Sequence, residues 1–293
     1  MRSEVKSFNL ERAASLDAVL ARMAAEPGQH VPIAGGTELM VAFNTGRLTA
    51  HSLISIQHLE ELRFIRVDAD RITLGAGATF TDIRQHALLA EELPLLGLAA
   101  SWTGSVANQN RGTVGGNICN ASPAADTPPA LLAYDAEVTL ISASGMRTMS
   151  YCEFHLGYKR TALRPDELLY SVAIRRSYAG ARQYLRKVGT RKAQAISKTA
   201  LAAVAFVREG QIKEIRIGAA SLADRPLRLH GTEAVLSNAS VARDQLDATV
   251  RLARAALFAE AKPIDDIRST ARYRAHVAAN LLEEFLRSLN ADG

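Results

Sequence analysis

Residues 112–126 read GTVGGNICNASPAAD, a glycine pair set among small polar residues and followed by a single acid, and they are the most informative part of the chain. Glycine has no Cβ, so it can adopt φ > 0 and let backbone N–H groups approach an oxyanion closely. Residues 31–41, VPIAGGTELMV, read as a short apolar strand, a glycine turn and the start of a helical turn. Together the two segments predict a site for a ligand with a polyphosphate spine.

Each glycine pair also has a simpler interpretation. Glycine marks tight turns, and Gly35-Gly36 taken alone fits an ordinary turn as well as a phosphate site. Neither segment has the GxGxxG spacing of a Rossmann domain, and no lysine follows the glycines as it does in a P-loop. A Rossmann domain and a P-loop NTPase are therefore disfavoured.

Five segments, in order along nearly the whole chain, carry a family resemblance. They are AGGTE at 34–38, TVGGN at 113–117 with its acid at 126, GYKRT at 157–161 before PDELL at 165–169, RKVGTR at 186–191 with AISK at 195–198, and STARYR at 269–274. In these segments the chain resembles the FAD-binding (medium) subunits of the xanthine dehydrogenase and carbon monoxide dehydrogenase class of molybdenum hydroxylases. The ordered set is far more specific than any one segment.

The resemblance implies an α+β fold in two domains. Residues 1–177 would form a two-lobed FAD-binding domain of the vanillyl-alcohol-oxidase/PCMH type, with a small α/β lobe over about 1–58 and a larger α+β lobe over about 59–177. Residues 178–293 would form a small antiparallel sheet-plus-helices C-terminal domain. The length of 293 residues agrees, because single hydrophobic cores rarely grow to this size.

Local patterns predict the elements of this fold. Apolar residues at helical spacing behind Ser15 indicate a helix that stops near Pro27. Further expected elements are strands at 31–34 and 52–56, a hairpin over 64–78, helices at 81–92 and 95–106, a helix at 130–134, a strand at 137–141, and an antiparallel hairpin of strands 199–207 and 212–220. Two amphipathic helices follow, with inner faces at Leu246, Val250, Ala253 and Leu257, and at Tyr273, Val277, Leu281 and Phe285.

The resemblance also implies which residues contact FAD. The segment from Pro32 to Leu39 would hold the pyrophosphate, and the segment from Thr113 to Asn117 would lie on the dinucleotide and flavin side. The full implied set is Pro32, Ile33, Ala34, Gly35, Gly36, Thr37, Glu38, Leu39, Thr103, Thr113, Val114, Gly115, Gly116, Asn117, Ser122, Asp126, Tyr158, Leu169, Lys187 and Ile196. None of these is assigned a catalytic role.

Several members of this set have plain structural alternatives. Asp126 falls on the family acid that contacts the cofactor, and the less favoured alternative is a helix or turn cap before Pro128-Pro129. Lys187 aligns with a family lysine near the flavin ring, where a cation would stabilise the reduced ring, although most lysines are exposed.

The other side chains of this set also have more than one interpretation. Leu169 and Ile196 fall on ring-lining positions, yet from sequence both read as core residues. Tyr158 could gate the electron acceptor or be a surface tyrosine. Thr103 stands where xanthine dehydrogenases often carry an aromatic, so a stacking contact there is not expected.

The implied function is electron transfer. A large molybdopterin-binding subunit with the molybdenum cofactor and a small subunit with 2Fe-2S clusters would be the partners, in a heterotrimer or its dimer, and electrons would leave through FAD to NAD or another acceptor. One alternative is a stand-alone FAD oxidoreductase, for which no paired carboxylate or histidine arrangement supplies an acid or base. Another is a non-catalytic assembly protein that kept the fold.

Histidine and cysteine usage bounds the cofactors. The seven histidines form no metal-ligand spacing, and the first glycine turn runs into Thr37 and Glu38 rather than a histidine, so we expect non-covalent FAD and no metal in this chain. Cys119 and Cys152 are too few to hold an iron-sulfur cluster, which needs four ligands. Some relatives have an extra four-cysteine cluster loop, and this chain should lack it.

Charge and hydropathy exclude other classes. The formal charge is +5, but the basic residues are mixed with acids and aromatic residues are only 5%, which disfavours nucleic-acid binding. Residues 1–8 carry charges where a signal peptide needs an apolar core, and no apolar run reaches the roughly 18 residues that a membrane span requires. The sequence therefore predicts a cytoplasmic protein that does not enter a membrane.

Overall fold

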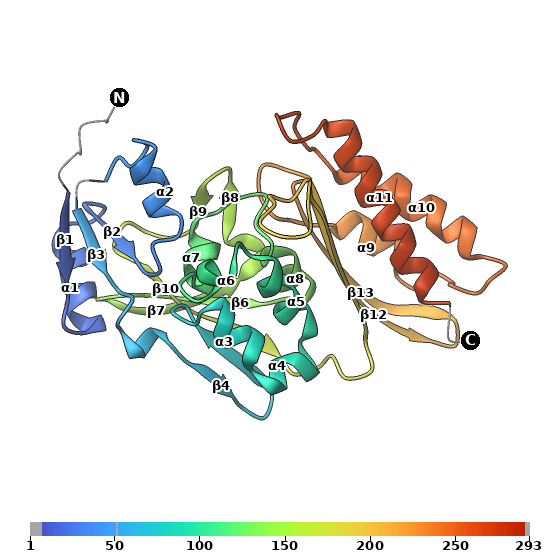
Figure 1. Cartoon of the computed structure of the whole chain (residues 1–293). Coiled ribbons are helices and arrows are strands. Elements are labelled where there is room, and N and C mark those ends of the chain that lie inside the picture. Colours follow the sequence, from blue (N-terminus) through green and yellow to red (C-terminus); the bar gives the residue numbers. More distant parts are fainter. Residues whose placement is uncertain (1–7, 51, 291–293) are drawn as a thin grey trace.

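The computed structural model describes residues 8–50 and 52–290 and arranges them around three main sheets that follow one another along the chain (Figure 1). The sequence argument against a signal peptide rests mainly on residues 1–7, which lie outside the described residues.

The N-terminal lobe is a three-stranded parallel sheet with one longer helix packed on it. Its strands are β1 (Asn9–Arg12), β2 (His30–Ile33) and β3 (Ser52–Ser55), in the order β1-β3-β2, and its helices are α1 (Leu16–Ala25) and α2 (Leu39–Asn44). The hydroxyl of Ser15 accepts a hydrogen bond from Ala18 N at 3.2 Å, which confirms the predicted start of α1. The core of this lobe also contains Ile141 and Leu168, which come from the next sheet.

The middle of the chain forms a five-stranded antiparallel sheet covered by short helices. The strands, in the order β4-β5-β10-β6-β7, are β4 (Ile65–Val67), β5 (Arg71–Gly75), β6 (Glu137–Ser142), β7 (Gly145–Ser150) and β10 (Leu168–Arg175). The helices are α3 (Phe80–Gln85), α4 (Ala87–Glu92), α5 (Pro94–Trp102), α6 (Val106–Gln109), α7 (Val114–Cys119) and α8 (Pro128–Ala133), with 3-10 turns η1 (Glu60–Leu62) and η2 (Tyr151–Glu153) and a hairpin of β8 (His155–Gly157) and β9 (Arg160–Thr161).

The C-terminal part is a four-stranded antiparallel sheet with three helices on its outer face (Figure 1). Its strands are β11 (Arg182–Val188), β12 (Thr199–Arg208), β13 (Gln211–Ala220) and β14 (Leu227–Arg228), and its helices are α9 (His230–Leu236), α10 (Leu246–Glu260) and α11 (Ala271–Ser288).

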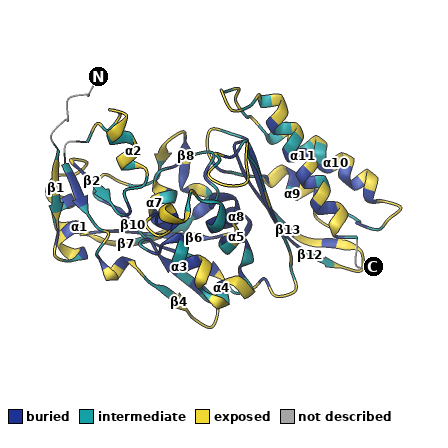
Figure 2. Ribbon diagram, viewed as in Figure 1, coloured by how far each residue is buried: buried dark blue, intermediate teal, exposed yellow. Residues whose placement is uncertain are grey.

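Strand β12 is buried on both faces, and it therefore joins the two halves of the molecule (Figure 2). Leu201 and Ala203 pack with the C-terminal helices, while Ala202 and Val204 belong to the core of the middle sheet. Neighbouring strand β13 approaches α8 so closely that a Cβ on Gly218 would lie 2.2 Å from the carbonyl oxygen of Pro129. Small residues in these strands allow the helices on both sides to come near.

Most predicted elements are confirmed to within a few residues. These are α1, β2, β3, the β4–β5 hairpin, α8, β6, the β12–β13 hairpin and the inner face of α10. The single helix predicted over 81–92 is wrong, because the chain breaks into α3 and α4 at His86, where the backbone is extended. The helix predicted over 95–106 is interrupted after Trp102, and Gly104 has φ +61 before α6 begins.

The predicted inner face of α11 is also partly wrong. Leu281 and Phe285 are buried as expected, but Tyr273 is 42% exposed and Arg274 takes the inner position, with only 3% exposed. A buried guanidinium needs hydrogen-bond partners, and the loop before the helix supplies one of them in Asp266.

Candidate functional site

The two glycine segments, far apart in sequence, meet in the structure. The backbone of Gly35 lies so close to residue 111 that a Cβ on Gly35 would be 1.8 Å from the carbonyl oxygen of Arg111. Arg111 in turn donates from Nε to the carbonyl of Gly35 at 3.2 Å and from Nη2 to Gln57 Oε1 at 2.9 Å. Glycine at position 35 is therefore required by the contact between the lobes, and the fold brings the segments 31–41 and 112–126 together.

The first segment offers unpaired hydrogen-bond donors. Gly36 has φ +71, the left-handed conformation predicted for a glycine turn. Among the described residues, no group accepts a hydrogen bond from the backbone N–H of Gly35, Gly36, Thr37 or Glu38. Consecutive N–H groups without protein partners are the donors that a phosphate oxygen can use.

The second segment differs from its prediction. It is not a turn but the helix α7, which begins when Thr113 Oγ1 accepts a hydrogen bond from Gly116 N at 3.1 Å. The N–H groups of Val114 and Gly115 are bonded to carbonyls of the neighbouring strand region, each at 2.9 Å, and neither Gly115 nor Gly116 has positive φ. The prediction that the N–H groups of this segment hold an anion is therefore wrong.

The glycines of α7 instead remove bulk. A Cβ on Gly115 would lie 2.6 Å from Ala76 Cβ, so this glycine lets α7 pack on the end of β5. Gly116 is exposed, and a Cβ there would meet only Thr113 Oγ1, at 3.1 Å, among nearby atoms. The fold itself leaves the space above Gly116 open, and a ligand could approach the helix backbone there.

A buried polar atom beside Gly116 lacks a partner. Asn117 Oδ1 is shielded from solvent yet accepts no hydrogen bond from any described residue. Buried side-chain oxygens in folded proteins are nearly always paired, so an orphaned acceptor indicates a missing donor. A bound group carrying N–H or O–H would satisfy it.

Asp126 and Lys187 form a nearly buried ion pair. Lys187 Nζ lies 2.6 Å from Asp126 Oδ2, and the two side chains are 9% and 11% exposed. Ser197 Oγ donates to the other carboxylate oxygen at 2.7 Å, and Lys187 also reaches the carbonyl of Trp102 at 3.3 Å. Burial raises the pKa of Asp126, although Lys187 and Ser197 both stabilise its charged form.

The pair joins separate parts of the chain. Asp126 lies in the loop after α7, whereas Lys187 is on β11 and Ser197 precedes β12. The structure thus brings together two charged residues that the resemblance implied as cofactor contacts. Asp126 does not cap the following helix, whose N-cap is Thr127.

Three other predicted residues have local roles. Thr103 turns its hydroxyl back to the carbonyl of Ala99 at 3.0 Å, and Ser122 Oγ accepts from Ala124 N at 3.3 Å. Leu169 is 4% exposed and belongs to the core of the middle sheet. Their contact with a cofactor stays a prediction.

Two predicted residues are exposed large apolar side chains. Tyr158 is 65% exposed between β8 and β9, and Ile196 is 51% exposed in the loop before β12. Such exposure suits contact with a ligand or partner, but an isolated surface apolar residue is also normal.

Sequence reasoning missed Lys159, the neighbour of Tyr158. Its Nζ donates to Asn120 Oδ1 at 2.6 Å, at the end of α7, and lies 3.8 Å from Glu38 Oε1, in the first segment. Burial lowers the pKa of Lys159. Lys159 belongs to the GYKRT segment, and its positive charge was the one sequence feature that could have indicated a role in the site. Its contacts with both glycine segments are seen only in the structure.

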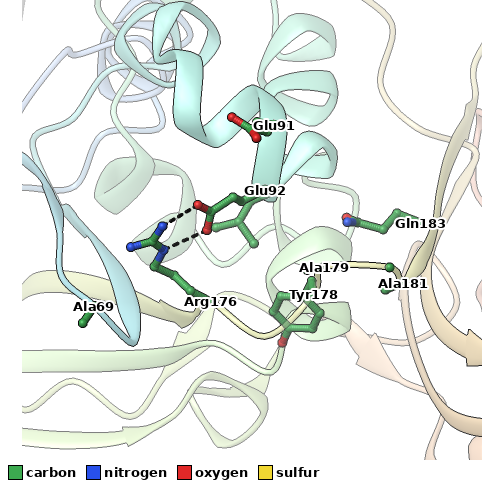
Figure 3. Close-up of a pocket in the computed structure, with 10 residues that line it drawn as sticks. Ala69, Glu91, Glu92, Arg176, Tyr178, Ala179, Ala181 and Gln183 are labelled. Atoms are coloured by element: carbon green, nitrogen blue, oxygen red, sulfur yellow. Dashed lines mark hydrogen bonds and ion pairs between the residues drawn. The ribbon is translucent and has the colours of Figure 1, made fainter.

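A cavity of about 590 Å³ lies elsewhere, where the link to the C-terminal sheet passes α4 (Figure 3). Arg176 and Glu92 form a two-bonded ion pair on its wall, at 2.6 and 2.9 Å. None of the predicted cofactor residues lines it, so it is separate from the site above. Within the described ranges, no three His, Cys, Asp or Glu side chains converge as metal ligands, and no helix is long and apolar enough to cross a membrane.

Comparison with known proteins matches both halves of the chain. The family described as the FAD binding domain in molybdopterin dehydrogenase matches residues 6–176, and the CO dehydrogenase flavoprotein C-terminal domain matches residues 184–289. The nicotinate dehydrogenase FAD-subunit of Eubacterium barkeri is 38% identical over 56% of this chain and 57% of its own length. The xanthine dehydrogenase FAD-binding subunit of Escherichia coli O157:H7 is 27% identical over 94% of this chain and 93% of its own.

A solved structure agrees over almost the whole length. A chain of carbon monoxide dehydrogenase from Hydrogenophaga pseudoflava superposes with a TM-score of 0.90 at 26% identity, covering 95% of each chain. The chain belongs to the FAD-binding medium subunits of the xanthine dehydrogenase and carbon monoxide dehydrogenase family of molybdenum hydroxylases. It is the flavoprotein component of an oxidoreductase.

Proposed function

We propose that FAD binds non-covalently across the meeting point of the two glycine segments. The observation that carries this proposal is the run of N–H groups from Gly35 to Glu38, which have no acceptor among the residues that the structure describes and lie near a helix whose Gly116 is open. The N–H groups would bind the pyrophosphate, with Lys159 as a cation close to the same segment. The orphaned Asn117 Oδ1 would accept a hydrogen bond from the cofactor.

Each segment has its own part in this site. The loop at 34–38 supplies donors, and its conformation is fixed by the packing of Gly35 on Arg111. The α7 helix supplies a surface that a flat group can reach, because Gly116 presents no side chain. The implied contacts of Pro32, Ile33, Ala34 and Leu39 lie on the same segment as the donors.

Lys187 and Asp126 would lie beside the flavin ring. Bound FAD supplies the ability to accept electrons singly and release them as a pair. Lys187 holds a positive charge in a nearly buried position, where it acts with little screening by solvent. Asp126, which is itself held by Ser197, fixes the direction of the Lys187 side chain.

We further propose that the chain transfers electrons from 2Fe-2S clusters in a small partner subunit, reduced by a large molybdopterin-binding subunit, through FAD to NAD or another acceptor. The name "carbon monoxide dehydrogenase medium chain", carried by a Hydrogenophaga pseudoflava relative 28% identical over 88% of each chain, supports an assembly with other subunits. A heterotrimer or its dimer is the expected form.

The test is a spectrum of the purified chain. A yellow protein whose flavin absorption is released by heat, and whose released compound is FAD on chromatography, is the expected result. A chain that is colourless and unchanged by added FAD contradicts the proposal. Reduction of the bound flavin by a dithionite-reduced 2Fe-2S partner subunit tests the electron path, and turnover by the chain alone would favour a stand-alone oxidoreductase instead.

A further inference from the structure

The STARYR segment at 269–274 takes no direct part in the site described above, yet it holds an unusual residue. Arg274 lies in the first turn of α11 and is 3% exposed, although arginine is seldom fully buried. Thr270 is the N-cap of this helix, and its Oγ1 accepts a hydrogen bond from Tyr273 N at 3.2 Å. A buried charge of this kind needs specific partners.

Arg274 joins two segments. Its Nη2 donates to Asp266 Oδ1 at 2.6 Å, and its Nη1 donates to the carbonyl oxygen of Lys198 at 2.6 Å. Its Nε is buried without an acceptor among the described residues. Next to it, the ring of Tyr273 lies 5.2 Å from the Nζ of Lys198. Consecutive residues of α11 therefore hold both the backbone and the side chain of Lys198.

The held segment leads directly to the charged pair of the site. Ser197 is fully buried and donates to Asp126 Oδ1 at 2.7 Å, while Asp126 Oδ2 contacts Lys187 at 2.6 Å. From behind, Ser221 Oγ donates to the carbonyl of Ser197 at 3.0 Å. Arg274 thus holds the carbonyl of Lys198, and the preceding residue, Ser197, donates the hydrogen bond that orients Asp126.

We propose that Arg274 is a positioning residue, which holds residues 197–198 so that Ser197 orients Asp126 and, through it, Lys187. The inference rests on the proposed placement of Lys187 beside the flavin. Arginine suits the task because its planar fork reaches the Asp266 carboxylate and the Lys198 carbonyl at once. A lysine could satisfy only part of this geometry.

The test measures the reduction potential of bound FAD and the FAD dissociation constant in the full chain. Arg274→Gln should shift the potential and weaken FAD binding about 2- to 30-fold, the range of mutations that act through neighbouring residues. Arg274→Lys should cause a smaller shift in potential and a smaller loss of FAD binding than Arg274→Gln. Arg254→Gln is the matched control, because it removes another arginine pair of the same helix layer, to Glu283 and Asn280, away from the site.

A double-mutant cycle separates positioning from general stability. Ser197→Ala should give a similar shift while leaving Arg274 in place, and the double variant should add little, because both act through one contact. Two results would overturn the inference if the wild type binds FAD. One is that the effects of Arg274→Gln and Ser197→Ala add fully in the double variant. The other is that FAD has the same reduction potential in Arg274→Gln as in the control Arg254→Gln. If Arg274→Gln does not fold, Ser221→Ala, which removes the hydrogen bond to the neighbouring carbonyl of Ser197, takes its place under the same criteria. A wild-type chain that binds no FAD would instead overturn the proposed function.

Discussion

At the scale of single residues, three glycines of the site are required for different reasons. Gly35 allows two backbones to touch, Gly115 allows α7 to pack on Ala76, and Gly116 leaves an open surface. Only the third has no role in the fold of the chain itself. This separation allows stability and ligand binding to be tested independently.

Replacing Gly116 and Gly115 by alanine should have opposite results. Gly116→Ala should leave the free energy of unfolding unchanged or raise it by up to about 1 kcal/mol, because alanine favours helix. It should nevertheless weaken FAD binding. Gly115→Ala should lower the free energy of unfolding by about 1–3 kcal/mol through overpacking on Ala76. Urea unfolding and FAD titration of both variants check this, and normal FAD affinity in Gly116→Ala would refute the open-surface argument.

Lys159 should contribute charge to cofactor binding. Lys159→Met should weaken FAD binding and make it less sensitive to salt, because a cation near the phosphates is lost. Titrations at low and high ionic strength measure both effects. Lys213→Met, which removes an exposed lysine bonded only to Gln211 Oε1 among the side chains described, is the control. Equal salt dependence in wild type and Lys159→Met would show that Lys159 does not face the phosphates.

The site was predicted where sequence segments are distinctive, and missed where contacts are long-range. The two glycine segments were predicted from their residues, and the resemblance added Asp126 and Lys187 as separate cofactor contacts; their ion pair is seen only in the structure. The contacts of Lys159 and Arg274 are not periodic and involve no special residue type, so no local pattern predicts them. Nor could the sequence show that the N–H groups of α7 are already paired.

At the scale of elements, the long helix α10 was predicted well, whereas the short helices between residues 80 and 109 were not. The four inner residues of α10 repeat at helical spacing and are all buried. The break between α3 and α4 occurs at His86, whose ring Nδ1 accepts a bond from Leu89 N and so caps the second helix. The glycine pair of α7 favours a turn by propensity, but the Thr113 cap and packing on β5 make it helical.

The hairpin β8–β9, which carries Tyr158 and Lys159, begins at a buried histidine. His155 is 5% exposed, with Nε2 3.0 Å from Tyr151 Oη and Nδ1 unpaired among the described residues. Burial, with a smaller effect from Arg225, lowers the pKa of His155 to about 4 from 6.5. The folded chain therefore keeps this ring neutral in mildly acid solution.

Acid should destabilise the protein through this histidine. Between pH 6.5 and 4 the unfolded chain binds a proton that folded His155 does not, so the stability present above pH 6.5 is lost as the pH falls. The loss should approach roughly 3 kcal/mol. Urea unfolding of the wild type and His155→Gln from pH 7 to 4.5 checks this. The variant should lose part of the slope, whereas exposed His276→Gln should keep it; identical slopes in all three would contradict the assignment.

At the scale of the whole molecule, the central strand β12 serves two cores. The sequence shows only an apolar run over 199–207, which fits any buried strand. The positions of α8 and the C-terminal helices decide which β12 residues face the middle core and which face the C-terminal core. Contacts outside the strand set those positions. The expected domain boundary near residue 177 stays a prediction.

A fragment of residues 1–177 should not fold like the intact chain. Leu185, Ala202 and Val204 belong to the core that the fragment must complete, and α8 packs on β12 and β13. Their removal exposes apolar surface on α8, so the fragment should bind a hydrophobic dye and unfold with lower cooperativity. Full-length protein at the same concentration is the reference. A fragment with sharp unfolding and no dye binding would show that the middle core is complete without β12.

The core of the first lobe has a consequence for synthesis on the ribosome. Ile141 and Leu168 complete the core against which the apolar face of α1 packs. The first lobe therefore cannot complete its core when only its own residues have left the ribosome. The about 110 residues between position 58 and Leu168 take roughly 5 to 20 s to translate. During that interval the apolar surface of the first lobe lacks part of its core, and it is completed only when the middle sheet is made.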